Sequence, residues 1–535
     1  MLTRKKILTY TAVSALAVKI FFAVSFYFSY FESYHLVPGL DMQTLLRYSE
    51  WLGENSYPSF FTFHRLVIFL VWLLNGKNHC VWAIFIIQSL IGIAGAVCMA
   101  DTVRKLSGSR KTALICGIAS GIYLPSLVYE FSVLKETFAV NFSLFLFWSM
   151  LHALHRKFDW KSSLLFGFCC FAALEGRVAI LPYVGICGIY CIYKMWKYRK
   201  AKRVFLCALF PALLLLTASA FNKVCGSWQF SPFFNIVSYT IEYNAAAPPP
   251  ATADLPATPT AASKLQNIRQ TIVNAASRVP TLFKHGELPE NQNIYFWSEK
   301  IPQYKLLIGP GLLIPCAAMG IMIIIFSGAW KKRYGLLLLP VITLMLPLCA
   351  REPIGRYRLM LVPYFFMISC CAVLIFSKLQ SPKRRGFALL GAGIGAFFSI
   401  HNGEVPQRIR YSDYRSYAIA VANTPEVSKE EILSAVYEYW EATGFRSSAA
   451  FEMMMGKALS VGELQLASSV ITQAAANGID INIIRYFNAW IYALQNRPIK
   501  VKEELEKIHT LPRELQQKAA RLYYDTIRIL NNTKK

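Results

Sequence analysis

The chain has 535 residues, of which 55% are hydrophobic, 14% aromatic and only 16% charged. This composition excludes a soluble protein of this size and favours a polytopic membrane protein, because the apolar residues form blocks long enough to cross a bilayer. The formal net charge of +26 does not indicate nucleic-acid binding, since no basic stripe interleaved with aromatic residues appears on a soluble face.

Eleven apolar segments are predicted as transmembrane helices. In chain order they cover residues 7–31, 79–103, 112–129, 136–154, 162–175, 178–193, 204–221, 304–327, 334–350, 359–378 and 386–400. A further stretch, FFTFHRLVIFLVWLLNG at 60–76, begins with His64 and Arg65 and is predicted to lie in the interface. If it spans the bilayer instead, every orientation after it reverses.

The basic residues predict the topology. Lys and Arg gather in every second loop, around residues 4–6, 104–111, 156–161, 194–203, 331–333 and 378–385. The positive-inside rule places these loops and the N-terminus in the cytoplasm. The first apolar segment is too long for a cleaved signal peptide and is expected to act as a signal anchor. The chain is therefore predicted to be an integral protein of a plasma or inner membrane.

The other loops are then extracytoplasmic. The first covers residues 32–78, and the longest covers 222–303 and contains a Pro/Ala/Thr run that is expected to be a lid or spacer rather than a glycosylated tract. After residue 400 the apolar residues recur at helical spacing, with Gly near the predicted helix ends. We expect residues 1–400 to form the membrane domain and 401–535 a soluble, tetratricopeptide-like helical domain on the outer side.

Acidic residues stand where the chain leaves the membrane. In HLVPGLDMQTLLRYSEW, residues 35–51, Asp41 follows a Pro-Gly turn. In LVYEFSVLKETFAV, Glu130, Lys135 and Glu136 fall within seven residues. Asp41 is also a good helix N-cap, and the other three could form an interfacial ion cluster, so a catalytic and a structural interpretation stay open for each.

Arginines occur on the outer side, where the positive-inside rule makes them rare. Arg177 follows Glu175 in a tight turn, and Arg356 and Arg358 lie in REPIGRYRLMLVP. Guanidinium groups bind phosphate through paired hydrogen bonds and stay charged when desolvated, so the group suits a phosphate-bearing ligand. Structural alternatives are a turn pair for Arg177 and snorkelling to headgroups for the other two. The scattered His residues form no metal-binding motif.

The order of these features resembles the GT-C superfamily of integral-membrane glycosyltransferases, particularly the dolichyl-phosphate-mannose protein mannosyltransferase and aminoarabinose lipid A transferase branch. The resemblance covers about residues 7–378. It implies that Asp41 is the catalytic base or orients the acceptor, and that Glu130 or Glu136 is the second acid. The resemblance of RYRLMLVP implies phosphate contacts for Arg356 and Arg358, and Lys135, Arg177 and Arg65 are further candidates for phosphate binding. GLDMQ has a lone Asp where many relatives carry two acids, which leaves a divalent metal open.

The resemblance implies transfer of a sugar from a polyprenyl-phosphate carrier to a protein, glycan or lipid acceptor, with inversion at the anomeric carbon. Two alternatives stay open. An O-antigen ligase or polymerase would place its base late in the chain, near SIHNGE at 399–404. A lipid or solute transporter would be non-enzymatic and would normally show repeated halves or helices broken at the midplane.

Overall fold

The computed structural model describes residues 3–53, 70–74, 81–177, 180–209, 212, 270, 273–274, 276–287, 292–349, 355–401 and 409–533. Within these ranges all regular secondary structure is helical, apart from one isolated bridge between Tyr123 and Ile308. The all-α prediction is confirmed for this part of the chain. Arg65 and the Pro/Ala/Thr run fall outside it.

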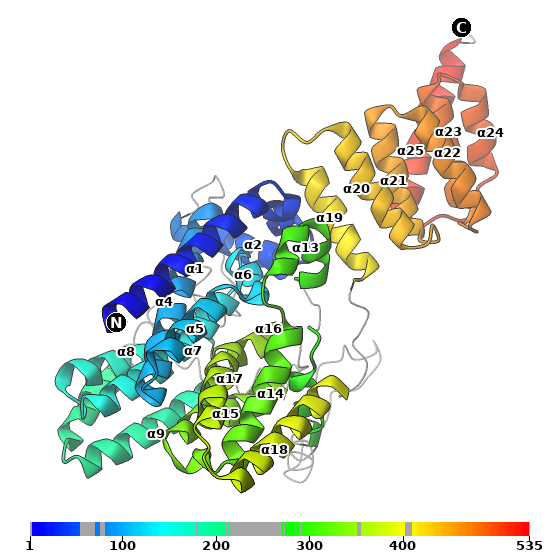
Figure 1. Cartoon of the computed structure of the whole chain (residues 1–535). Helices are drawn as coiled ribbons and strands as arrows, with labels where there is room; N and C mark the ends of the chain where they lie inside the picture. Colours follow the sequence, from blue (N-terminus) through cyan, green and yellow to red (C-terminus); the bar gives the residue numbers. More distant parts are fainter. Residues whose placement is uncertain are drawn as a thin grey trace. The chain divides into compact units, whose positions relative to one another are not determined.

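The chain divides into two compact units (Figure 1). The membrane unit comprises Met1–Phe26 and Gly39–Arg408, and the helical unit comprises Tyr27–Pro38 and Ile409–Lys535. The segment just before Asp41 thus belongs to the helical unit, although it lies far from that unit's other residues in the sequence.

The membrane unit contains helices of two kinds, α-helices and short 3-10 helices. Its first part contains α1 (Arg4–Tyr27), α2 (Asp41–Gly53), α4 (Val81–Ser107), α5 (Arg110–Gly121), α6 (Leu124–Glu130), α7 (Glu136–His155), α8 (Trp160–Gly176), α9 (Leu181–Lys197) and η3 (Ala201–Arg203). Its second part contains η4 (Val279–Phe283), α13 (Ile294–Lys300), η5 (Pro302–Leu306), α14 (Pro310–Phe326), η6 (Ala329–Lys331), η7 (Arg333–Leu337), α15 (Leu338–Cys349), α16 (Gly355–Arg358), η8 (Leu359–Leu361), α17 (Val362–Ser377) and α18 (Pro382–His401).

Four helical stretches in the described ranges are long and apolar enough to cross a membrane: Arg4–Tyr27, Val81–Ser107, Glu136–His155 and Arg356–Ser377. Two shorter apolar helices cover Pro310–Phe326 and Arg333–Met345. The prediction of an integral membrane protein agrees with these helices, whereas the number of eleven spans stays a prediction. Of the stretch 60–76, only residues 70–74 are described, and they are helical.

Glycines allow neighbouring helices of the membrane unit to approach closely. A Cβ on Gly395 in α18 would lie 2.7 Å from the backbone carbonyl of Ala318 in α14. A Cβ on Gly176 at the end of α8 would lie 3.0 Å from the Cα of Ala139 in α7. The second approach brings the residue after Gly176 beside the start of α7, and this is where the candidate site lies.

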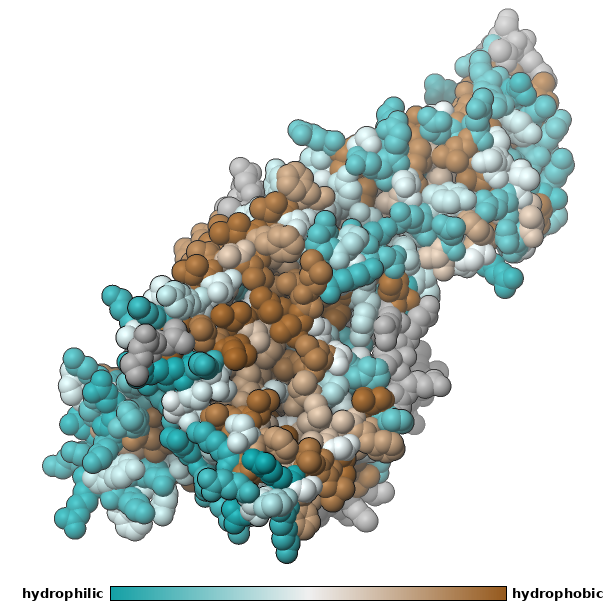
Figure 2. All heavy atoms as spheres, viewed as in Figure 1, coloured by the Kyte–Doolittle hydropathy of each residue, from teal (hydrophilic) through white to brown (hydrophobic). Residues whose placement is uncertain are grey.

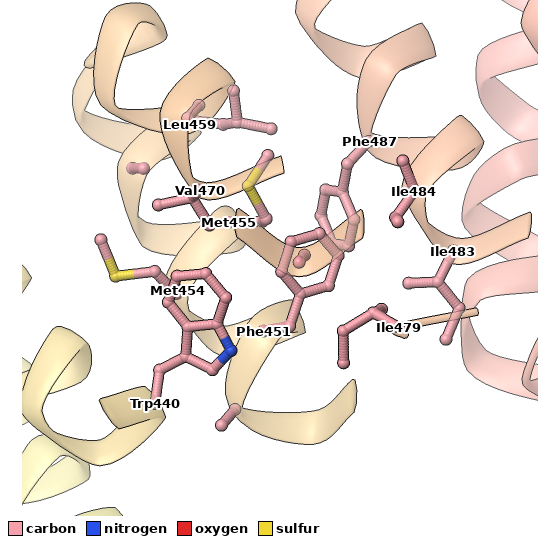
Figure 3. Close-up of a cluster of buried hydrophobic side chains, with 14 of the residues drawn as sticks. Trp440, Phe451, Met454, Met455, Leu459, Val470, Ile479, Ile483, Ile484 and Phe487 are labelled. Atoms are coloured by element: carbon pink, nitrogen blue, oxygen red, sulfur yellow. The ribbon is translucent and has the colours of Figure 1, made fainter. Parts of the chain in front are cut away.

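The helical unit consists of η1 (Tyr30–Leu36), α19 (Tyr411–Asn423), α20 (Lys429–Ala442), α21 (Ser448–Val461), α22 (Leu464–Ala476), α23 (Ile481–Leu494), α24 (Pro498–Glu506) and α25 (Arg513–Thr533). Its core is aromatic and aliphatic, with Phe451 between Trp440 and Phe487 at centroid distances of 6.0 and 5.4 Å (Figure 3). Consecutive helices contact each other in chain order, as expected for stacked hairpins.

Residues 27–38 are fixed to this unit by polar and aromatic contacts. The Tyr30 hydroxyl donates to Glu431 at 2.6 Å, and the Thr424 hydroxyl donates to Ser33 at 2.6 Å. Phe31 lies 5.6 Å from Tyr417, measured between ring centroids. Burial and the bond to Glu431 raise the pKa of Tyr30 to about 12, and the same hydrogen bond lowers the pKa of Glu431.

We expect Tyr30→Phe to destabilise the helical unit at neutral pH and to leave its stability unchanged in acid. A lowered folded-state pKa means that the ionised Glu431 stabilises the fold above its ordinary pKa, and that this contribution is lost as pH falls through the folded value. Thermal unfolding of wild type and variant from pH 7 to pH 3 measures the effect. A difference in melting temperature that does not shrink in acid would contradict it.

Candidate functional site

The first pair in the site joins residues 315 positions apart in the sequence. Gly39, at φ +87°, turns the chain in the left-handed region that favours glycine, and α2 begins two residues later at Asp41. A guanidinium nitrogen of Arg356, in α16, donates to the Asp41 carboxylate. The side chain of Asp41 is 46% exposed and that of Arg356 17%, so the acid is the accessible member.

Tyr357 connects this pair to a second arginine. The guanidinium carbon of Arg356 lies 5.2 Å from the centroid of the Tyr357 ring, and that of Arg177 lies 4.2 Å from it. Tyr357 is buried. A cation over a desolvated ring is attracted by the ring quadrupole by about 2 kcal/mol. The ring therefore attracts both guanidiniums and offsets part of their mutual repulsion.

Arg177 in turn meets the acid at the start of α7. Its Nη1 lies 3.9 Å from Oε1 of Glu136, whose side chain is 2% exposed. Among the described residues, neither carboxylate oxygen of Glu136 accepts a hydrogen bond. The helix dipole favours a negative charge at this first position of α7. Glu136 thus retains unused hydrogen-bonding capacity.

We name the five residues Asp41, Arg356, Tyr357, Arg177 and Glu136 the four-charge site. They come from the start of α2, from α16, from the end of α8 and from the start of α7. Two carboxylates balance two guanidiniums, so the group has no net charge in the absence of a ligand. The described residues contain no cluster of three or more His, Cys, Asp or Glu side chains suited to a metal ion.

Arg358 has different partners. Its guanidinium donates to the carbonyl oxygens of Lys284 and Gly286 at 2.6 and 2.8 Å and to the Glu287 carboxylate at 2.8 Å. Both charged side chains are buried, Arg358 at 3% and Glu287 at 8% exposure. Arg358 therefore fastens part of the long loop 222–303 next to the four-charge site.

Glu130 is paired with Lys19 of α1, and both side chains are buried, at 6% and 5% exposure. Gly92 of α4 makes room for the pair, because a Cβ there would collide with the Glu130 carboxylate and lie 2.8 Å from the Lys19 nitrogen. Glu130 and Glu136 are the two candidates for the second acid, and only Glu136 belongs to the four-charge site. Lys135 is half-buried and precedes it at the N-cap of α7.

The sequence interpretation did not identify three of these residues as important. Tyr357 stands between two arginines in RYR, a spacing that could have signalled stacking. Glu287 is an ordinary acid in a polar loop, and nothing local links it to Arg358. Gly92 is one of two glycines in the apolar helix α4, and only the tertiary structure shows that it lies beside an ion pair.

We expect Gly92→Ala to destabilise the membrane unit by about 1–3 kcal/mol, because the added methyl group must displace a buried ion pair. The matched control is Gly188→Ala in α9, where a Cβ would meet nothing within 4 Å. Thermal unfolding in detergent, followed by size-exclusion chromatography, compares the two. Equal melting temperatures for both variants would contradict the packing around Gly92.

No family model matches the chain, and a search of curated proteins found no match. Among solved structures, the chain is similar to the archaeal oligosaccharyltransferase AglB from Archaeoglobus fulgidus, in complex with an inhibitory peptide and a dolichol-phosphate. The TM-score is 0.38 at 12% identity, over 82% of this chain, which spans 59% of AglB. It is also similar to ArnT from Cupriavidus metallidurans bound to undecaprenyl phosphate. Here the TM-score is 0.38 at 13% identity, over 94% of this chain and 81% of ArnT.

Proposed function

We propose that the chain is a membrane glycosyltransferase of the GT-C type, which transfers a sugar from a polyprenyl-phosphate carrier to an acceptor hydroxyl. The ion pair between Asp41 and Arg356 is the observation that carries the proposal. It joins the acid of the first outer loop to the late arginine, the two positions at which the resemblance expects a base and a phosphate ligand. Neighbours at a TM-score of 0.38 add no weight to it.

The two guanidiniums of the four-charge site suit the phosphate of the donor. Arg356 and Arg177 face one ring, Tyr357. Arg356 already donates to the Asp41 carboxylate, and Arg177 lies 3.9 Å from that of Glu136. A phosphate oxygen can replace a carboxylate oxygen at either guanidinium, because both anions accept the same paired N–H donors. Cations at this point stabilise the negative charge that develops on the departing phosphate.

Asp41 is the proposed general base. Its side chain is the more exposed of the two acids, so an acceptor hydroxyl can reach it. The acceptor O–H gives its proton to the Asp41 carboxylate while the oxygen bonds to the anomeric carbon. The bond from that carbon to the phosphate oxygen breaks, and its electron pair leaves with the polyprenyl phosphate. A single displacement of this kind inverts the anomeric centre.

The remaining predicted residues receive different roles. Glu136 is buried beside Arg177 and is proposed to orient that guanidinium toward the donor. Arg358 is proposed to hold the loop at 284–287 rather than to bind phosphate directly, since its buried guanidinium already donates three hydrogen bonds to that segment. Lys135 remains a further candidate for phosphate binding. Arg65 stays a prediction outside the described residues.

The predicted topology places the reaction at the extracytoplasmic face. All four segments of the site belong to loops that the positive-inside rule assigns to that side. A polyprenyl phosphate keeps its tail in the hydrocarbon region and its phosphate at the boundary, which is the depth expected for residues at the ends of membrane helices. Residues 401–535 are proposed to hold or select a protein, glycan or lipid acceptor.

We expect Asp41→Asn to lower kcat about 10²- to 10⁴-fold, the usual contribution of a general base, while donor binding is retained. Asn preserves the shape of the side chain and an oxygen that can face Arg356. Purified protein is assayed with a panel of short-chain polyprenyl-phosphate sugars, with Asp525→Asn as a control at an exposed acid of the helical unit.

Full activity in Asp41→Asn would remove the proposed base and favour a ligase-like enzyme whose base lies late in the chain. Transport of a lipid or solute in vesicles, without product formation by the wild type, would favour a transporter.

We expect Arg177→Gln and Arg356→Gln each to weaken donor binding about tenfold to a hundredfold, since each loses a charge-assisted contact to phosphate worth about 1.5–3 kcal/mol. Arg528→Gln, at an exposed arginine of α25, is the matched control. Binding of a short-chain polyprenyl phosphate is measured by calorimetry. Unchanged binding in both site variants would contradict the assignment of the phosphate subsite.

A further inference from the structure

A second group of charges lies at the opposite end of α7 from Glu136. The helix has 20 residues, which corresponds to about 30 Å at 1.5 Å per residue. Near its last turn, the indole nitrogen of Trp148 donates to the carboxylate of Asp101 at 3.1 Å. Asp101 is 2% exposed. A buried carboxylate at a helix end requires cations around it, and the structure provides an excess of them.

Cations from several elements gather at Asp101. Arg4, at the start of α1, lies 3.2 Å from Oδ1, and Arg104 lies 2.9 Å from the same oxygen. Lys105 lies 2.7 Å from Oδ2. Arg333, at the start of η7, donates to the backbone carbonyl of Lys105 at 3.2 Å. We name Asp101, Arg4, Arg104, Lys105 and Arg333 the basic end cluster.

The cluster carries more positive charge than its own acid can neutralise. Three cations contact the Asp101 carboxylate and Arg333 binds the neighbouring backbone carbonyl, so the four cations and one acid leave an excess of three positive charges. The two members from outside α4 are accessible, because the Arg4 side chain is 55% exposed and Arg333 is exposed as well. Their guanidinium donors can therefore reach a ligand in the surrounding medium.

An apolar surface begins beside this charge. Along α1, Val13, Leu16, Ile20 and Val24 recur at helical spacing and are 59%, 47%, 55% and 53% exposed. Figure 2 shows an apolar surface over the part of the membrane unit that contains α1 and hydrophilic residues near the beginning of the chain. Excess positive charge beside the exposed apolar face of α1 suits a molecule with an anionic head and a hydrocarbon tail.

We propose that the basic end cluster binds the headgroup of an anionic phospholipid, with an acyl chain along the exposed face of α1. The phosphate accepts from Arg4 and Arg333, while Asp101 holds Arg104 and Lys105 in place behind them. Anionic lipids concentrate in the leaflet that the positive-inside rule assigns to this end, and each basic residue near that surface contributes about 1 kcal/mol. The inference is independent of the proposed transferase reaction.

Native mass spectrometry of the full chain, released from mixed micelles of phosphatidylglycerol and phosphatidylcholine, tests the site. The wild type should retain phosphatidylglycerol in preference to phosphatidylcholine. The double variant Arg4→Gln with Arg333→Gln should retain about tenfold to thirtyfold less of it, as expected for two lost cations. The matched control is Lys500→Gln with Lys518→Gln, two exposed lysines of the helical unit, which is predicted on the opposite side of the membrane, and it should behave as the wild type.

Several results would overturn the proposal: equal retention of the two lipids by the wild type, unchanged retention in the arginine variant, or an equal loss in the lysine control. Glycerol phosphate, which has the anionic group without acyl chains, is the probe for a free phosphate ligand. Binding of it as tight as that of phosphatidylglycerol would exclude a lipid-specific site. A circular dichroism melt of each variant shows whether it has folded, and Arg4→Lys with Arg333→Lys should restore binding in part.

Discussion

A charge near the edge of a bilayer is stable only when another charge or a polar group compensates it, and this constraint organises the membrane unit. An unpaired ion in such a place costs several kcal/mol. The ion pairs accordingly connect segments that are distant in sequence: Lys19 with Glu130, Arg358 with Glu287, and Asp41 with Arg356. Glycines such as Gly92 and Gly176 provide the space that these contacts need. Each ion pair therefore fixes the backbone segments that carry its two members, in addition to neutralising their charges.

The four-charge site differs from the other pairs in the exposure of one of its acids, Asp41. The side chains of Lys19, Glu130, Arg358 and Glu287 are all less than a tenth exposed, whereas Asp41 is 46% exposed. Glu136 is buried but accepts no hydrogen bond from the described residues. An ion pair that serves only stability would satisfy both oxygens and exclude water. A site for an anionic donor and a hydroxyl acceptor requires charged groups whose hydrogen-bonding capacity is not fully used within the protein.

Much of this arrangement follows from residue type and position. A membrane protein could be predicted from the apolar blocks, and the approach of Asp41 to Arg356 could be expected from two charges that both lie in predicted outer loops. The sequence could not show that Glu136 rather than Glu130 belongs to the four-charge site. The two acids are six positions apart, and only the tertiary pairing of Glu130 with Lys19 beside Gly92 separates their roles. The partner of Arg358 was also unpredictable, since Glu287 lies in a loop without periodicity. The break between the two units at Pro38 depends on contacts such as Thr424 to Ser33, which leave no signal in a local pattern.

The most direct test of the central claim is an experimental structure of the full chain in a lipid nanodisc with a non-transferable polyprenyl-phosphate sugar analogue. We expect the phosphate within about 3 Å of the guanidinium nitrogens of Arg356 and Arg177, with the Asp41 carboxylate on the side of the anomeric carbon opposite the phosphate. A phosphate bound away from both arginines, or an Asp41 that remains paired and turned from the sugar, would contradict it.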